Sequence, residues 1–439
     1  MAMDYINHID NMRVYPDQKA ITNLQAFDEE LSNEPVETSE ILKQLDAYGS
    51  PATVAQTSGR YFGFVCGGIL PSALACKWLT DAWDQNPAMY VLSPVTSKIE
   101  EVTERWLKNL LGLPNETVAG YVSGSSAATI IGLTVGRNML LKKLGHDAAK
   151  NGLLNTPEIK VLLGAGAHST VYKALSIIGL GSGRIIMVPT DAQGRIRVDL
   201  LPNLDNRTLV ILQAGNVNSG AFDNFAEICS KAREAGSYVH VDGAFGLWAA
   251  ANERLHHLTG GVDLADSWSV DGHKTLNTPY DNGIILCRHK EMLVESLHMA
   301  GSYIVFSDKR DGMLYTTEMS RRARAIDLWA TLKGLGRQGV SDLVWELHQK
   351  AVYFSELLKI GGFEILNDVV FNQVLARYKS DEMTNRLVKG VQESGVCWLG
   401  GSQWDGKSVM RISVSSYKTT YEDIDLSANE ILRIAHNLK

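Results

Sequence analysis

Long apolar runs, basic runs and paired cysteines are all missing from this sequence of 439 residues. No window reaches the roughly 18 apolar residues of a membrane span, and the first residues lack the basic and apolar regions of a signal peptide. Acidic residues outnumber basic ones by 49 to 42, which argues against a nucleic-acid or anionic membrane partner. The five cysteines form no CxxC pair, which predicts reduced thiols, no metal site and a cytoplasmic protein.

Common catalytic signatures are missing too. The sequence contains no HExxH, no GxSxG and no GxxxxGK[ST], so the zinc-protease, serine-hydrolase and P-loop templates do not apply. What it does have is 45% apolar and 21% charged residues, enough to bury one large core or two unequal ones.

Short apolar segments alternate with helical patterns along most of the chain. The segments predicted as strands are residues 120–123, 160–163, 184–188, 209–213, 238–242, 267–270 and 283–287. This order predicts an α/β fold with a mostly parallel sheet that binds ligands at the carboxyl ends of its strands. We expect a helical N-terminal segment (1–57), a large domain (58–319) and a small C-terminal α/β domain (320–439).

Two polar clusters follow predicted strands. The first is YVSGSSAAT, in which Ser125 and Ser126 open a helix whose free N–H groups suit a phosphate; the alternative is an ordinary tight turn. The second is VHVDGAF, in which Asp242 ends a strand and needs a positive partner to stay ionised when buried. The alternative for Asp242 is a helix cap.

A third cluster, DSWSVDGHKTLN, places Lys274 after a strand and a glycine turn. A lysine held in such a semi-buried site can form a Schiff base, although most lysines merely cover surface. His168 follows another strand and has a flat ring that suits stacking, with a solvated histidine as the alternative. A lysine, a carboxylate and a phosphate cradle are together what pyridoxal 5′-phosphate requires.

At these residues the sequence resembles the group II pyridoxal-phosphate-dependent amino acid decarboxylases, the family of aromatic L-amino acid decarboxylase and glutamate decarboxylase. The resemblance covers about residues 55–435 and rests on His168, HVDGAFG and DSWSVDGHKTLN in the family's order. It implies the aspartate aminotransferase fold (PLP fold type I), with a seven-stranded sheet in the large domain. It departs from the family at Ala127 and Ala128, where an acidic residue is common.

The resemblance also implies a role for each site residue. Lys274 would form the Schiff base, Asp242 would pair with the ring nitrogen, and His168 and Ala244 would cover the two ring faces. The remaining cofactor contacts implied are Ser125, Ser126, His273 and either Ser267 or Asp271 for the phosphate, and Asn216 or Asn218 for the ring hydroxyl. Arg411 would meet the substrate carboxylate, with an ion pair to an interface acid as the alternative.

The implied reaction is decarboxylation of an L-amino acid to the amine and CO2, in a homodimer with shared active sites. Tyr303 would donate the proton, and Tyr61 and Phe62 in RYFGF favour an aromatic or medium-sized apolar substrate unless they belong to an interface core. The alternatives are an aminotransferase, a carbon–carbon lyase or an aldehyde-forming enzyme on the same cofactor. A non-catalytic binding protein is a remote alternative, since Lys274 and Asp242 are both present.

Overall fold

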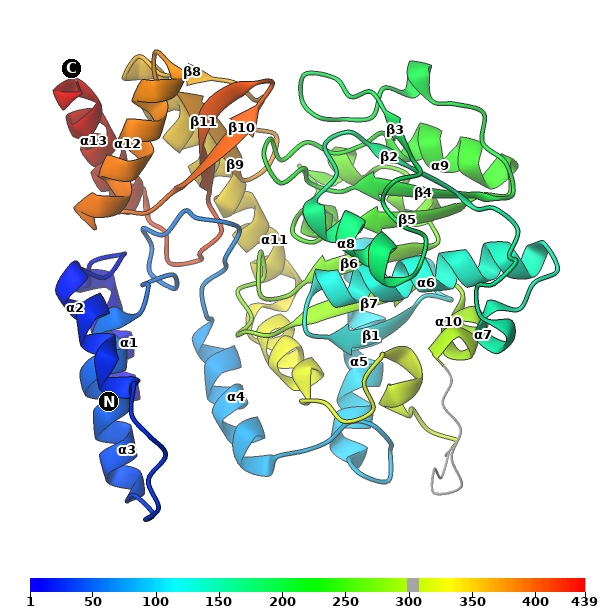
Figure 1. Ribbon diagram of the computed structural model, residues 1–439, viewed down its shortest axis with the longest axis horizontal. Coiled ribbons are helices and arrows are strands. Elements are labelled where there is room, and N and C mark those ends of the chain that lie inside the picture. The colour runs from blue at the N-terminus through cyan, green and yellow to red at the C-terminus, as the bar shows by residue number, and fades with distance from the viewer. Residues whose placement is uncertain (298–307, 439) are drawn as a thin grey trace. The chain divides into compact units, whose positions relative to one another are not determined.

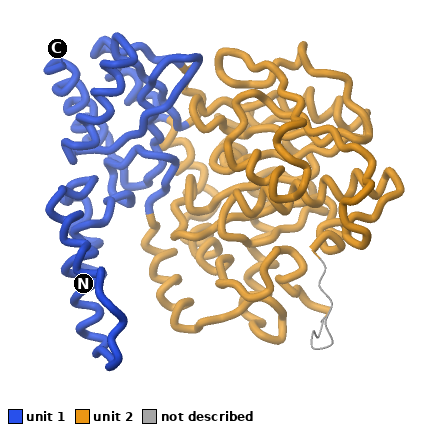
Figure 2. Tube along the Cα trace, in the orientation of Figure 1, with its two compact units in different colours: residues 1–68, 349–366, 372–439 blue, residues 69–348, 367–371 orange. Residues whose placement is uncertain are grey.

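A computed structural model of the chain describes residues 1–297 and 308–438. The chain forms two compact units (Figure 2). Unit 1 comprises residues 1–68, 349–366 and 372–439, and unit 2 comprises residues 69–348 and 367–371. The N-terminal residues thus share a unit with the C-terminal part of the chain, while the domain limits expected after residues 57 and 319 stay predictions.

A seven-stranded sheet forms the centre of unit 2, in the order β1-β7-β6-β5-β4-β2-β3 (Figure 1). The strands are β1 Val118–Val122, β2 Lys160–Gly164, β3 Ile185–Val188, β4 Thr208–Gln213, β5 Tyr238–Asp242, β6 Ser267–Asp271 and β7 Gly283–Cys287. Neighbours from β6 to β3 run parallel, and β7 is antiparallel to both β6 and β1. Every residue of β1, β4, β5, β6 and β7 is buried, as expected for a sheet covered on both faces. The mostly parallel α/β fold is therefore confirmed.

Helices surround this sheet, and one of them sets the geometry of the site. The helices of unit 2 are α4 Pro71–Trp83, α5 Pro94–Leu111, α6 Ser125–Lys143, α7 Ala148–Asn151, α8 Ser169–Ile177, α9 Phe225–Glu234, α10 Lys290–Leu297 and the first part of α11 Arg324–Ile360. Helix α6 packs across β4 to β7. Two glycines of α6 allow it to approach the sheet closely, because they have no Cβ. A Cβ at Gly132 would lie only 2.6 Å from His240 Nδ1, and one at Gly136 only 2.6 Å from Tyr238 Cδ1. None of the helices in the described part of the chain has the length and apolar character needed to cross a membrane.

Unit 1 contains the smaller, antiparallel sheet, in the order β10-β11-β9-β8. Its elements are α1 Ala2–His8, α2 Gln18–Asn23, α3 Thr38–Gln44, the last part of α11, β8 Glu364–Ile365, β9 Gln373–Arg377, α12 Asp381–Ser394, β10 Gly400–Trp404, β11 Lys407–Ser413 and α13 Tyr421–Asn437. The N-terminal segment is hydrogen-bonded into this unit, because Phe62 N donates to Trp398 O and Ser413 N donates to Phe62 O. The expected small C-terminal α/β domain is confirmed.

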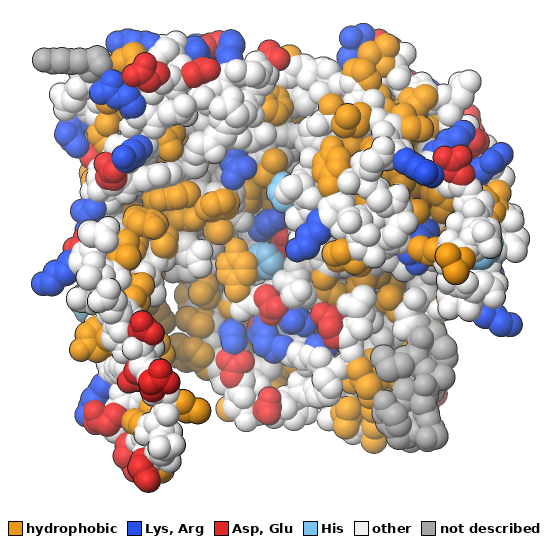
Figure 3. All heavy atoms as spheres, in the orientation of Figure 1, with side chains coloured by type: hydrophobic (Ala, Val, Ile, Leu, Met, Phe, Trp, Pro, Cys, Tyr) orange, Lys and Arg blue, Asp and Glu red, His pale blue; other side chains and the backbone are white. Residues whose placement is uncertain are grey.

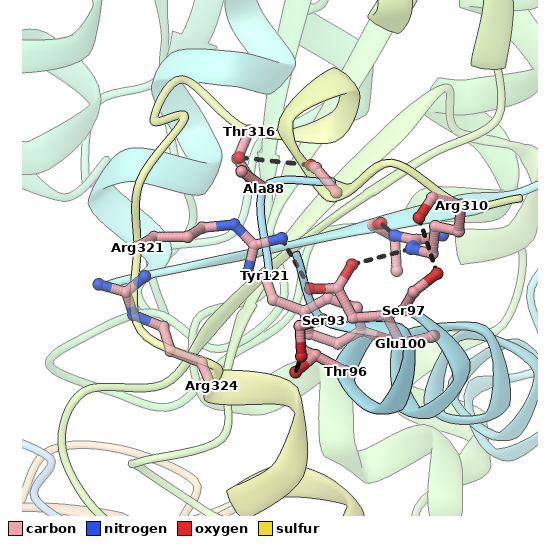
Figure 4. Close-up of polar contacts among 12 residues, drawn as sticks. Ala88, Ser93, Thr96, Ser97, Glu100, Tyr121, Arg310, Thr316, Arg321 and Arg324 are labelled. Atoms are coloured by element: carbon pink, nitrogen blue, oxygen red, sulfur yellow. Dashed lines mark hydrogen bonds and ion pairs between the residues drawn. The ribbon is translucent and has the colours of Figure 1, made fainter. Parts of the chain in front are cut away.

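A buried charge network lies in unit 2 between α5 and the chain that follows residue 307 (Figure 4). Arg310 Nε donates to Glu100 Oε2 at 2.9 Å, and Arg321 Nη2 donates to Glu100 Oε1 at 2.6 Å. Glu104 accepts a further bond from Arg310 Nη1 at 2.7 Å. Because the Glu100 and Arg321 side chains are only 1% exposed, their charges depend on each other rather than on water.

Candidate active site

Two carboxylates mark the carboxyl ends of the neighbouring parallel strands β5 and β6. Asp242 ends β5 and Asp271 ends β6, so both lie at the edge of the sheet where ligands of this architecture bind. Asp242 is 8% exposed, and its Oδ1 accepts a hydrogen bond from Ala244 N at 3.2 Å. Burial raises the pKa of the Asp242 carboxyl, and the charges of Lys274 and His168 oppose that shift. A carboxylate in this position stays ionised most easily opposite a further positive group.

Asp271 binds the lysine of the third motif. Its Oδ2 lies 2.9 Å from Lys274 Nζ and 3.6 Å from His273 Nε2. Ser125 N and Ser125 Oγ donate to its two oxygens at 2.6 and 2.8 Å. Burial alone would raise the pKa of Asp271, but Lys274, His273 and the hydrogen bonds outweigh it and the pKa is lowered. Asp271 is thus a buried anion paired with Lys274, and its expected contact with a phosphate stays a prediction.

The same contacts change the assignment of the first turn of α6. The Ser125 hydroxyl already donates to Asp271, whereas Ser126 is exposed. The turn packs closely against β7, since a Cβ at Gly283 would lie 2.3 Å from the Cα of Gly124. Ser126 is therefore the serine of this turn whose side chain faces solvent.

His273 lies beside this turn. A Cβ on Gly124 would lie 3.4 Å from His273 Cε1. Its Nδ1 accepts a hydrogen bond from Asn282 N at 3.0 Å, so the neutral ring carries its proton on Nε2. Burial lowers the pKa of His273, although the Asp271 carboxylate opposes the shift. The ring therefore presents an N–H donor toward the start of α6.

His168 caps the first turn of α8 from the end of the loop after β2. Its Nδ1 accepts a hydrogen bond from Thr170 N at 3.3 Å and lies 2.7 Å from Thr170 Oγ1. His168 is also one of the groups whose charge opposes the raised pKa of Asp242. Tyr303, the expected proton donor, lies outside the described residues.

One expected cofactor contact, Ser267, is wrong. Ser267 begins β6, is fully buried, and its Oγ lies 2.8 Å from His240 Nδ1. At about 3.3 Å per residue, four residues of strand separate it from Asp271 by roughly 13 Å. It therefore belongs to the seam between α6 and the sheet.

The Asn216 amide maintains the turn after β4. Its Oδ1 accepts from Asn218 N at 2.9 Å, and its Nδ2 donates to Gly166 O at 3.1 Å. Of the two asparagines, the half-buried Asn218 stays the predicted partner of the ring hydroxyl, and half-buried Ala244 stays the predicted contact on the ring face.

The predicted substrate residues lie in unit 1. Arg411 is half-buried on β11, its Nε has no hydrogen-bond partner, and no described residue forms an ion pair with it. Tyr61 stacks on Trp398 with ring centroids 5.2 Å apart. Phe62 is wrong as a substrate contact, because it is 0% exposed and packs edge-on against Phe354 in the core.

The aromatic ring that accompanies Tyr61, Trp398, was not predicted from the sequence. Trp398 stacks on Phe64 as well, at 5.6 Å, and Phe64 is 61% exposed. Gly63 is required between them, since a Cβ there would lie 2.0 Å from Trp398 Cζ3. No local pattern links Trp398 to residues more than 300 positions earlier, so only the fold reveals this aromatic group.

The comparison with protein families decides the identity of the site. The model of the pyridoxal-dependent decarboxylase conserved domain matches residues 22–379. This chain belongs to the pyridoxal-dependent decarboxylase family. It is accordingly a pyridoxal-phosphate-dependent carboxy-lyase, an amino acid decarboxylase, with the aspartate aminotransferase-like fold.

The names of the relatives that this decarboxylase resembles refer to different amino acids. Aromatic-L-amino-acid decarboxylase of Bacillus atrophaeus is 27% identical over 83% of this chain and 78% of its own length. L-2,4-Diaminobutyrate decarboxylase of Rhizobium meliloti is 26% identical over 89% of this chain and 79% of its own length. The fold matches the crystal structure of Oryza sativa TDC with PLP and tryptamine, with a TM-score of 0.90, 21% identity and coverage of 99% and 95% of the two chains.

The residues of this decarboxylase fit its cofactor. The buried Asp242 carboxylate accepts only one hydrogen bond among the described residues, so it suits a cationic ring nitrogen. The Lys274 side chain is 23% exposed, so it is only partly buried beside the edge of the sheet. Ser126 and the Nε2–H of His273 suit a phosphate at the start of α6.

Proposed function

We propose that this decarboxylase removes the carboxyl group of an L-amino acid and releases the amine and CO2, with the cofactor attached through Lys274. The observation that carries the proposal is that Asp242 ends β5 and Lys274 closely follows the end of the neighbouring parallel strand β6, so both lie at the carboxyl edge of the sheet. When bound, pyridoxal phosphate supplies an electron sink for the electron pair that the departing carboxyl group leaves behind.

The side chains of unit 2 have separate roles in this proposal. Asp242 keeps a proton on the ring nitrogen, because an ionised buried carboxylate is stabilised by a cationic partner. His168 lies against the cofactor ring, and Ala244 lies on the opposite face. Ser126 and His273 bind the phosphate. Because Asp242 and His273 are almost completely buried, water competes little for either contact.

Arg411 binds the substrate carboxylate in this proposal. Burial lowers its pKa, its Nε lacks a hydrogen-bond partner, and no ion pair forms with any described residue, so an incoming anion would satisfy it. The Tyr61–Trp398–Phe64 group favours a substrate with an aromatic or flat apolar side chain, in agreement with the name of the Bacillus atrophaeus relative.

The atom that receives a proton after CO2 has left decides which product forms. Tyr303, which lies outside the described residues, is the predicted donor to the substrate Cα, and protonation there gives the amine. An aldehyde or keto product would instead indicate one of the alternative reactions on the same cofactor.

We also propose a homodimer. Apolar side chains are exposed on the N-terminal helical segment of unit 1, among the acidic ones that Figure 3 shows there. They include Leu31 at 97%, Val36 at 56% and Leu45 at 56% exposure. Apolar groups at this density usually mark an interface, and a second copy is the commonest partner. Light scattering of the purified protein tests the mass.

The test of the reaction is to incubate the cofactor-loaded protein with a panel of L-amino acids and identify products by mass spectrometry. We expect one amino acid, aromatic or flat and apolar, to lose CO2 and give its amine, and the Lys274→Ala variant to be inactive. Carbonyl products, cleaved fragments or full activity of the variant would contradict the proposal.

A further inference from the structure

Asp271 bonds to two separate parts of the site through one carboxylate. Its oxygens accept from Ser125 at the start of α6, and Oδ2 also lies 2.9 Å from the nitrogen of Lys274. We propose that Asp271 is a positioning residue that holds the Lys274 nitrogen in register with the first turn of α6 for attachment of the cofactor. The inference rests on the proposed function of Lys274.

The backbone fixes Asp271 itself. Asp271 N donates to Ala244 O at 2.9 Å, and Trp248 Nε1 donates to Asp271 O at 2.9 Å. The residue is 1% exposed, so its carboxylate has little freedom to follow a moving partner. The flexible Lys274 side chain therefore adopts the position that Asp271 sets. An amine that is already held in position loses less conformational entropy when it reacts, which lowers the barrier.

The charge balance of the attachment step agrees with this role. The Lys274 nitrogen bonds to the aldehyde carbon of the cofactor, and the aldehyde oxygen leaves as water with two of the three ammonium protons. The new carbon–nitrogen double bond keeps the third proton and the single positive charge. Asp271 thus has a partner of charge +1 before and after the step, and no buried anion is left without one.

Substitution by asparagine separates the two contacts of Asp271. The amide oxygen of an Asp271→Asn variant still accepts from Ser125 N, but the amide has no charge to pair with Lys274. Asp266→Asn is the matched control, because Asp266 lies just before the other end of β6 and bonds to a backbone N–H and to His289. Ser125→Ala is a second variant that leaves the Asp271–Lys274 pair in place and removes one donor that fixes the carboxylate.

The experiment mixes cofactor-depleted full-length protein with pyridoxal 5′-phosphate and follows the visible absorption band. Borohydride reduction and peptide mass spectrometry then locate the bond to Lys274. A parallel titration uses 4-deoxypyridoxine 5′-phosphate, which lacks the aldehyde and reports binding without attachment. The pH at which the visible band changes is recorded as well. The charged groups facing this nitrogen in the described residues are Asp271, Asp242 and His273, and the Asp271→Asn variant alters only the first.

We expect Asp271→Asn to slow attachment at least roughly tenfold and to lower the midpoint pH of the band by about one unit, because a nearby opposite charge shifts a titration by that order. Its affinity for the deoxy compound should change less than about threefold, Ser125→Ala should slow attachment less, and Asp266→Asn should behave as native. An unchanged attachment rate and band, or equal losses for both ligands, would overturn the inference. If the native protein forms no bond at Lys274, the proposed function itself fails.

Discussion

Arg310 Nε lies 2.9 Å from Glu100 Oε2, and the two side chains are 6% and 1% exposed. Glu100 also accepts from Arg321, so one carboxylate serves two buried guanidinium groups. Removing a single partner of such a network leaves uncompensated charge in the interior.

Glu100→Gln is therefore expected to lower the free energy of unfolding by about 3–5 kcal/mol. Urea denaturation followed by circular dichroism measures the change. Glu101→Gln is the control, since Glu101 forms an exposed pair with Lys98 that is worth less than about 1 kcal/mol. Equal effects of the two substitutions would mean that Glu100 contributes no more than a surface charge.

Asp242→Asn is expected to lower kcat/KM by about 100-fold or more. Breaking a buried charge pair costs about 3–5 kcal/mol, and each 1.4 kcal/mol in the barrier is about a factor of ten. Steady-state assays on the substrate found in the amino acid panel measure this loss. Asp199→Asn, which removes an exposed pair with Arg197, should keep native activity, and a fully active Asp242→Asn would exclude Asp242 from the reaction.

Acid should destabilise the protein through His240, which is buried between β5 and α6. Burial lowers the pKa of His240 from 6.5 to about 3. Below pH 6.5 the unfolded chain binds a proton that the folded chain does not, so this contribution to stability is present above pH 6.5 and is lost as the pH falls toward 3. The slope from this one group approaches about 1.4 kcal/mol per pH unit.

The His240→Gln variant removes this titration. Its urea unfolding between pH 7.5 and 5 should depend less on pH than that of the native protein. The exposed His257→Gln variant should keep the native slope. Parallel curves for the native and His240→Gln proteins would show that His240 binds its proton equally in both states.

Truncation to alanine should lower the stability of the protein at Phe62 and weaken substrate binding at Phe64. Phe62→Ala is expected to cost about 3–5 kcal/mol of unfolding free energy, because its ring is fully buried against Phe354. Phe64→Ala should cost less than about 1 kcal/mol and instead raise KM, since its ring is exposed beside Trp398. Thermal melts and steady-state assays separate the two effects, and an unchanged KM in Phe64→Ala would remove Phe64 from substrate binding.

The strand segments, and the placement of Asp242 and Lys274 after two of them, could be predicted because each depends on a local pattern. A short, mostly apolar segment that ends in a carboxylate, such as YVHVD, indicates both a buried strand and a group at its carboxyl end. The seven predicted strands and the sheet edge follow from such runs.

The partners of these residues could not be predicted, because they depend on pairing across the chain. Ser125 and Ser126 are adjacent and chemically identical, yet only the approach of β6 to α6 decides that Ser125 binds Asp271. Likewise, Tyr61 and Phe62 alternate between two faces of an extended segment, and only the neighbours Trp398 and Phe354 distinguish the two faces.

Unit 1 is built from both ends of the chain, with Phe62 hydrogen-bonded to Trp398 and Ser413. During translation the ribosome releases residues 1–68 long before it makes residues 372–439. Unit 2 is almost contiguous and can fold in the meantime, while the N-terminal segment waits with its apolar side chains uncovered. We therefore expect truncation of the last strands to leave nascent residues 1–68 dependent on chaperones, even when the cofactor-binding sheet has already formed.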